Sequence, residues 1–269
     1  MYNSQAATYC TPAYVNEKMG QTVLPHTNEI IIPTPDGKNL VAWQTPSSHN
    51  NGPVVLLLPG RSKNLAFCTS TIRLLSQWGI SSLVLGWRGF SGSSGTPSQR
   101  GLILDARTAY NVLTGRQEHT SIKPIDPQKL VIMAASLGTL PATFLCAQEG
   151  VNPQALVLIA SMSSIVDVAQ HHLPWLRVIH PQLAAWIVRD PWQADEVAHR
   201  VTCHVLQIHG NKDEIIPERF ARALHDRFPS GKAEMHVIPG GHLPSSPEFI
   251  PCLTQFLGQR FPNHPFPRP

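Results

Sequence analysis

The stretch Lys129–Leu140, KLVIMAASLGTL, decides how the rest of the chain is interpreted. It begins with an apolar run, Leu130 to Ala134, that predicts a short strand buried on both faces. The run passes through Ser136 directly into an apolar segment that predicts a helix. A serine at such a sharp turn needs small neighbours, and its hydroxyl stands at the positive end of the helix. Serine is also a common helix N-cap, so the stretch is consistent with a nucleophile and with a plain cap.

Further apolar runs on both sides of this stretch alternate with helical patterns. The runs that predict strands are 54–58, 80–85, 130–134, 155–160, 204–208 and 234–238. Helical patterns occupy 66–78, 102–113, 137–148, 217–228 and 247–260. This alternation predicts an α/β fold with a mostly parallel central sheet and helices on both faces.

The N-terminal part of the chain follows other patterns. Residues 1–24 are polar and irregular, and we expect them to lie across the surface. Two apolar runs, 29–32 and 40–43, flank Asp36-Gly37, which predicts an antiparallel hairpin at a sheet edge.

One segment, residues 161–201, is too long for a plain crossover between two strands. Its prolines favour several short helices, so we predict a small helical cap inserted into a single domain that spans residues 1–269. A single long crossover helix is the alternative. The cap's large apolar side chains are predicted to form the walls of a substrate site; they are Trp175, Leu176, Trp186 and Ile187.

Composition narrows the class of protein. Of 269 residues, 42% are hydrophobic and 14% charged, as in a globular protein with a large core. The net charge of +4 is scattered, so nucleic acid is not a predicted partner. The five cysteines form no CxxC pair, which indicates reduced thiols rather than a zinc site or a disulfide framework. No secretory signal and no transmembrane run is present, so we expect a cytoplasmic protein.

Three polar side chains each follow a predicted strand. Ser136 follows one, HGNKD ends at Asp213 after another, and PGGH ends at His242 after the last. Because the carboxyl ends of parallel strands meet at one edge of a sheet, we expect these side chains to lie close together. Ser136 would attack, His242 would act as base and then acid, and Asp213 would orient the imidazole. This order along the chain favours a catalytic triad.

Other residues complete or compete with this prediction. The backbone N–H groups of Leu137 and Arg61 are predicted to form the oxyanion hole. Asp167 follows another strand and is an alternative acid. The glycines of 89–95 could in principle hold a phosphate, but they lack the spacing and the lysine of a phosphate loop. His171-His172 has no carboxylate or cysteine pattern nearby beyond Asp167, so a polar surface is favoured over a metal site.

These motifs together resemble the alpha/beta-hydrolase superfamily over about residues 27 to 260. AASLG around Ser136 resembles its nucleophile elbow, HGNKDEIIP at 209–217 its acid loop, and GGH at 240–242 its histidine loop. WRGFSGSSG at 87–95 is similar to the glycine-rich loop after the fourth strand of the family. Within the superfamily, the chain is most similar to abhydrolase-domain proteins related to lysophospholipases and protein-depalmitoylating thioesterases.

The chain departs from the family pattern at four positions. Ala134 replaces the first glycine of the elbow, and Pro59 stands where many members have histidine. Gly86 replaces a frequent aspartate near Arg88, which predicts that an ion pair is missing there. Pro141 lies early in the helix after the elbow and is expected to weaken its first turns.

The sequence therefore predicts a serine hydrolase that cleaves a carboxylic ester or thioester through an acyl-enzyme. We expect a small-molecule or lipid-like acyl substrate and neither cofactor nor metal. Two alternatives stay open: an amidase or aminopeptidase-type hydrolase on the same triad, and a non-catalytic ligand-binding member of the fold.

Overall fold

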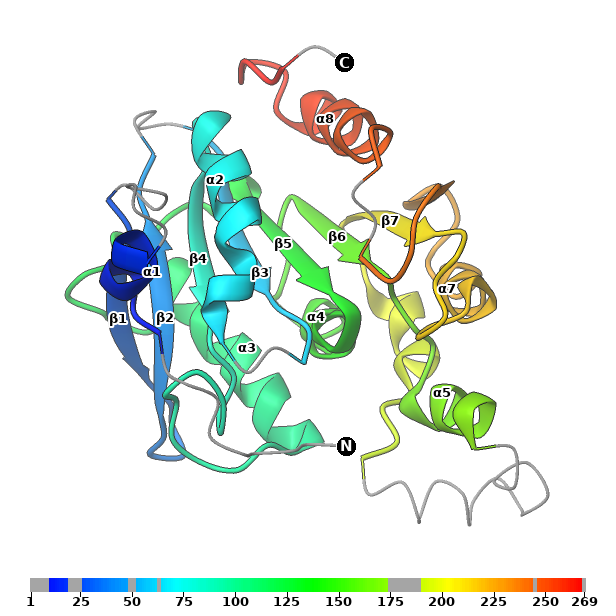
Figure 1. Ribbon diagram of the computed structural model, residues 1–269, viewed down its shortest axis with the longest axis horizontal. Helices are drawn as coiled ribbons and strands as arrows, with labels where there is room; N and C mark the ends of the chain where they lie inside the picture. The colour runs from blue at the N-terminus through cyan, green and yellow to red at the C-terminus, as the bar shows by residue number, and fades with distance from the viewer. Residues whose placement is uncertain are drawn as a thin grey trace.

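An eight-stranded sheet forms the centre of the computed structural model, which describes residues 10–18, 26–47, 52–61, 64–173, 190–243 and 246–267 (Figure 1). The strand order is β1-β2-β4-β3-β5-β6-β7-β8. The strands are β1 Asn28–Pro33, β2 Asn39–Thr45, β3 Val54–Leu58, β4 Ser81–Leu85, β5 Leu130–Ala135, β6 Ala155–Ile159, β7 His204–Gly210 and β8 Ala233–Ile238. All neighbours from β4 to β8 pair in parallel, whereas β2 is antiparallel to both β1 and β4. The predicted sheet and edge hairpin are confirmed.

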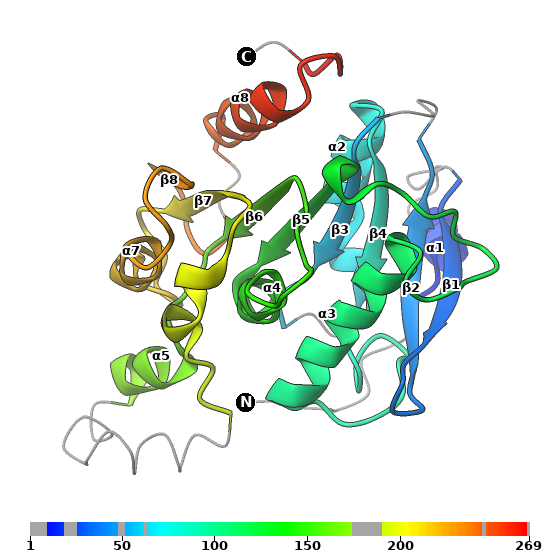
Figure 2. The same ribbon diagram turned by 180° about the vertical axis from the view of Figure 1, so that it is seen from behind.

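Helices cover both faces of this sheet. They are α1 Pro12–Lys18, α2 Thr69–Gln77, α3 Gln99–Leu113, α4 Thr139–Cys146, α5 Ile165–His172, α7 Glu218–His225 and α8 Phe249–Arg260. Figure 1 shows α2 in front of the strands, and Figure 2, from behind, shows α3 and α4 in front. Buried side chains of α3, α4 and α7 belong to one apolar cluster, and those of α1, α2 and α8 to another. Among the residues described, no helix is both long and apolar enough to span a bilayer.

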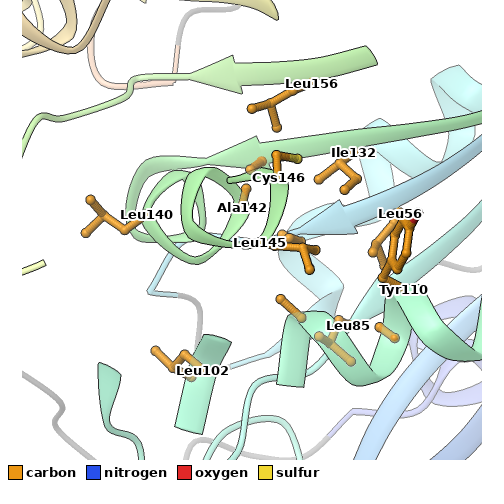
Figure 3. Close-up of a cluster of buried hydrophobic side chains, with 14 of the residues drawn as sticks. Leu56, Leu85, Leu102, Tyr110, Ile132, Leu140, Ala142, Leu145, Cys146 and Leu156 are labelled. Atoms are coloured by element: carbon orange, nitrogen blue, oxygen red, sulfur yellow. The ribbon is translucent and has the colours of Figure 1, made fainter. Parts of the chain in front are cut away.

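Alternation along the strands sends neighbouring side chains to opposite clusters. Leu56 and Ile132 pack into the cluster under α4, while Leu57 and Met133 pack into the cluster under α2 and α8. Figure 3 shows side chains of the first cluster, which joins Leu145 and Ala142 of α4 to Leu56 and Ile132 of the strands.

Several element boundaries differ from those predicted. Residues 12–18 form the short helix α1, anchored by buried Val15, where the sequence predicted irregular structure. The helix predicted from residue 66 opens as the 3₁₀-helix η1 Leu65–Cys68 before α2 begins. Helix α3 starts three residues earlier than predicted, because the Ser98 side chain accepts a hydrogen bond from the Gly101 N–H and caps it.

Pro141 does not disrupt the helix after the elbow. It lies in the first turn of α4, where backbone N–H groups have no intrahelical acceptor to lose. A fixed φ therefore fits the first turn and the helix forms with Pro141 in place, while the expected weakening of its first turns stays a prediction.

The predicted cap is only partly visible in the described residues. These show α5, the 3₁₀-helices η5 Ala194–Glu196 and η6 Ala198–Arg200, and the segment from Asp190 that leads to them. Ser164 caps α5 by accepting a hydrogen bond from the Asp167 N–H. Residues 174–189 lie outside the described residues, so the cap stays a prediction.

Candidate active site

Ser136 occupies a strained turn at the carboxyl end of β5. Its backbone φ of 51° is in the left-handed region, which residues other than glycine rarely adopt. The turn opens the 3₁₀-helix η3 Ser136–Gly138, which leads directly into α4. A Cβ on Gly138 would lie 2.6 Å from the Pro59 carbonyl oxygen, so only glycine lets this turn pass so close to the end of β3. The small residue predicted after Ser136 is therefore required by the packing of strand and helix.

The three side chains that follow β5, β7 and β8 meet at this turn. His242 Nε2 lies 2.8 Å from Ser136 Oγ, although the two residues are 106 positions apart in the chain. On the other side of the ring, His242 Nδ1 lies 2.8 Å from Asp213 Oδ2. One imidazole thus bridges the hydroxyl and the carboxylate, with both distances in the hydrogen-bonding range.

Asp213 is held by more than the imidazole. Its Oδ1 accepts hydrogen bonds from the backbone N–H groups of Ile215 and Ile216, at 2.9 and 2.8 Å. Burial by itself raises the pKa of this carboxyl, but the hydrogen bonds from His242 and from the two N–H groups outweigh burial. The pKa of Asp213 is therefore lowered, and the side chain is an anion at neutral pH.

Close backbone contact aligns the acid loop with the histidine loop. A Cβ on Gly210, the last residue of β7, would lie 2.5 Å from the carbonyl oxygen of Gly240, so a side chain there would overlap the neighbouring loop. The Lys212 N–H donates a 2.8 Å hydrogen bond to the same carbonyl. These contacts fix the distance between Asp213 and His242 through the main chain.

Sequence reasoning missed His209, a fully buried residue at the end of β7. Its Nε2 lies 2.8 Å from the Ile216 carbonyl oxygen and 3.4 Å from Asp213 Oδ2. Because both neighbours are acceptors, Nε2 carries the proton. Burial lowers the pKa of His209, so the ring is neutral at neutral pH. The sequence HGNKD contained this residue, but nothing in its spacing indicated that the ring turns back toward the acid.

The loop after β3 abuts Ser136. A Cβ on Gly60 would lie 3.1 Å from Ser136 Cβ and 3.6 Å from its Oγ, which puts the Gly60 backbone against the hydroxyl. The Trp87 indole N–H donates a 2.8 Å hydrogen bond to the Pro59 carbonyl and holds this loop. Leu137 and Arg61, whose N–H groups are the predicted oxyanion donors, line the same cavity as Ser136.

That cavity, with a volume of about 1230 Å³, opens at Ser136 and His242. Most of its wall is apolar. It extends over one face of the sheet between α2 and α8, and residues of α5 complete it on one side. The four cap residues predicted as substrate walls, Trp175, Leu176, Trp186 and Ile187, lie outside the described residues.

The rival acid and the histidine pair make contacts away from the serine. Asp167 Oδ2 accepts a hydrogen bond from Ser163 Oγ at 2.8 Å, within its own segment, while Asp213 holds the imidazole. His172 Nε2 lies 2.8 Å from the Ile215 carbonyl oxygen, and His171 Nδ1 lies 2.8 Å from an Arg219 nitrogen. No three His, Cys, Asp or Glu side chains cluster as a metal would require within the ranges described.

The prediction that Arg88 lacks an ion-pair partner is wrong. Its guanidinium contacts Asp105 Oδ1 at 2.7 Å and Asp36 Oδ2 at 2.8 Å, which join α3 and the β1–β2 turn to the loop after β4. These carboxylates take the place of the one missing at Gly86. Burial lowers the pKa of the guanidinium, but the two carboxylates outweigh it, and the net shift is upward.

Comparison with known proteins shows the family to which the chain belongs. The family model described as alpha/beta hydrolase fold matches residues 53–195. An uncharacterized protein of Mycobacterium tuberculosis is 31% identical over 234 residues, which cover 85% of this chain and 76% of that protein. The chain therefore belongs to the alpha/beta hydrolase family, and it is a hydrolase by fold.

Individual relatives and structures extend the comparison. The lysophosphatidylserine lipase ABHD12 of Danio rerio is 26% identical, with 93% of this chain and 69% of that protein covered. The alpha/beta hydrolase domain-containing protein WAV2 of Arabidopsis thaliana is 27% identical, with coverages of 80% and 75%. The esterase Pf2001 of Pyrococcus furiosus shares the fold with a TM-score of 0.71 at 14% identity, over 97% of this chain and 96% of that one.

Proposed function

We propose that the protein is a serine hydrolase that cleaves a carboxylic ester or thioester through an acyl-enzyme. The observation that carries the proposal is the pair of 2.8 Å contacts by which His242 links Ser136 Oγ to Asp213. A serine hydroxyl is a weak nucleophile at neutral pH and needs a base within hydrogen-bond reach, which these contacts supply.

In the first half of the reaction, Ser136 Oγ attacks the acyl carbon while His242 Nε2 takes the hydroxyl proton. The charge of the resulting imidazolium is stabilised by the Asp213 carboxylate at Nδ1. The tetrahedral intermediate then collapses: the bond to the alcohol or thiol breaks, and His242 returns the proton to that leaving group. In the second half, water repeats the attack on the acyl-enzyme and releases the carboxylic acid and Ser136.

The developing oxyanion needs donors at a fixed position. The N–H of Leu137 follows the nucleophile directly, and Arg61 follows Gly60, whose backbone abuts the Ser136 side chain. Because of these positions, both N–H groups are proposed to form the oxyanion hole. One such donor typically lowers the barrier by about 3 kcal/mol.

Two observations favour an ester or thioester with an apolar acyl part. The cavity beside Ser136 is mostly apolar, and ABHD12, a relative of this chain, is named as a lysophosphatidylserine lipase. We therefore propose the lysophospholipase-like and depalmitoylating-thioesterase-like subgroup for this chain, with a lipid-like acyl compound as substrate.

A fluorophosphonate probe tests the proposal directly. The wild type should be labelled at Ser136 and should hydrolyse p-nitrophenyl esters, and Ser136→Ala should lose the label and on the order of 10⁶-fold of kcat. Asp167→Asn is the matched control, because the rival acid lies outside the proton path and should leave both activities intact. Absence of labelling in the wild type would indicate a non-catalytic member of the fold. Turnover of amides in preference to esters would indicate the amidase alternative.

A further inference from the structure

The cavity that opens at Ser136 is much deeper than the reacting atoms require. Its wall includes Leu57 and Met133, which lie in register on β3 and β5, and both side chains belong to the cluster under α2 and α8. Met133 is three residues before Ser136, so the cavity reaches roughly 10 Å below the hydroxyl at about 3.3 Å per strand residue. Its volume of about 1230 Å³ exceeds the roughly 300–1,000 Å³ of ordinary ligand pockets.

Two helices wall the cavity on the side away from the strands. Ser70, Thr71, Leu74 and Leu75 of α2 contribute one wall, and Phe249, Ile250 and Leu253 of α8 the other. Five of these seven side chains are apolar and none carries a charge. The cavity is therefore a channel between α2 and α8 that offers contacts to hydrocarbon and few partners to water.

The mouth of the channel is apolar as well. Phe67, Ile215 and Leu243 line it, with exposed fractions of 78%, 54% and 60%. They come from η1, the acid loop and the histidine loop, so they lie on three separate segments around Ser136. Single exposed apolar side chains are ordinary, but three of them at the entrance of one apolar channel favour an amphiphilic ligand.

The thiol of Cys68 lies inside the channel without adding a second reactive centre. Burial raises its pKa to about 12, so it stays protonated at neutral pH and packs as a small apolar group. Cys68 therefore acts as part of the apolar wall of the channel and does not compete with Ser136 as a nucleophile.

We propose that this channel holds the acyl chain of the substrate, with the carbonyl at Ser136 and the tail between α2 and α8. The inference rests on the proposed function and specifies its substrate as an ester or thioester of a long acyl chain. An extended chain advances about 1.3 Å per bond, so a depth of roughly 10 Å accommodates about eight carbons or more. The acyl chain lies against α2 and α8, and α5 closes one side of the channel.

A set of tryptophan substitutions along α2 tests the inference by blocking the channel at different depths and measuring the preferred length of the acyl chain. Thr71 is nearer the mouth than Leu74 by about 4.5 Å of helix. With p-nitrophenyl esters of two to sixteen carbons, wild-type kcat/KM should rise with chain length to at least eight carbons. Leu74→Trp should lower the preferred chain length, and Thr71→Trp should lower it further by about three carbons. Arg73→Trp, on the exposed side of the same helix, should leave the length profile unchanged.

A second arm on α8 covers the case in which an α2 variant does not fold. Leu253→Trp should also shorten the preferred chain, and Gln255→Trp, which is exposed on α8, should not. If folded variants on both helices keep the wild-type length profile, or if the wild type prefers acetate, the channel assignment is wrong. In that case fluorophosphonate labelling of Ser136 would persist, whereas failure of the proposed function would abolish labelling and all ester turnover.

Discussion

The two faces of the central sheet are filled in different ways, although the same strands supply both. Under α3 and α4, buried side chains such as Leu56, Ile132 and Leu145 form one apolar cluster, part of which Figure 3 shows. Under α2 and α8, the next residues along those strands, Leu57 and Met133, border a cavity of about 1230 Å³. We refer to these as the closed face and the hollow face.

The difference indicates that the two faces of the sheet have different roles in stability and in substrate binding. Close packing on one face supplies contacts that a side-chain deletion would remove. The hollow face has fewer such contacts, because its cavity next to Ser136 leaves space for a ligand. The residues at the strand ends, where the faces meet, should therefore govern rate, those of the closed face stability, and those of the hollow face the choice of substrate.

The largest expected effect lies at the strand ends. Asp213→Asn should lower kcat by about 10⁴-fold, equivalent to about 5 kcal/mol, because the amide favours the wrong tautomer of His242. Ester hydrolysis at saturating substrate measures the effect, and denaturant unfolding of the same protein measures stability. Near-normal kcat in a folded variant would remove Asp213 from the mechanism and with it the separation of rate from stability.

The ion pair next to the closed face should come second. Arg88→Met leaves the buried carboxylate of Asp105 without its partner, so unfolding free energy should fall by about 3–5 kcal/mol. The double variant Arg88→Met/Asp105→Leu should recover much of that loss, because neither charge is then buried. Urea unfolding compares the three proteins. An equal loss in the single and double variants would mean that packing, and not charge, is responsible.

Truncation of one buried leucine on each face compares how tightly the two faces are packed. Leu145→Ala on α4 should reduce unfolding free energy by about 3–4 kcal/mol, and Leu253→Ala on α8 by only about 1–2 kcal/mol. Both side chains are at most 1% exposed, but Leu253 already borders empty volume and has fewer contacts to lose. Equal losses in chemical denaturation would show that the hollow face is as well packed as the closed one.

The smallest effect is a pH dependence in the β1–β2 turn. Hydrogen bonding to Arg88 lowers the pKa of Asp36 to about 2, below its usual value of 3.8. The stabilisation is therefore complete above pH 4 or so and is lost as the pH falls toward 2. The carboxyl is 40% exposed, so water screens the interaction and the effect is small. Unfolding of Asp36→Asn should show a flatter dependence over this range than wild type, and identical profiles would contradict the pairing.

Local patterns in the sequence predicted most of the fold. Predominantly apolar runs predicted all six parallel strands, and Asp36-Gly37 predicted the edge hairpin, because each depends on a few adjacent residues. The meeting of Ser136, Asp213 and His242 could also be predicted, since parallel strands present their carboxyl ends at one edge. Their catalytic role stays a prediction.

What the sequence could not predict depends on contacts between distant segments. The pairing of Arg88 with Asp105 arises because α3 passes beside the loop after β4, and no spacing rule joins a loop arginine to a helix aspartate. The channel depends on the distance between α8 and the strands. The amphipathic pattern of a helix predicts which face is buried, but it does not predict this distance. His209 was missed for the same reason, since its partners follow from the return of the acid loop.

A ligand bound in the channel should shift the folding equilibrium toward the native protein. Its walls belong to β3, β5, α2 and α8, so a molecule that fills it touches segments from both halves of the chain. Such a molecule binds the native protein and not the unfolded chain, and at one hundred times its dissociation constant it adds about 2.7 kcal/mol to the free energy of unfolding. A non-hydrolysable apolar compound would then act as a thermal stabiliser, and melting temperature would report what the enzyme accommodates even where no bond is broken.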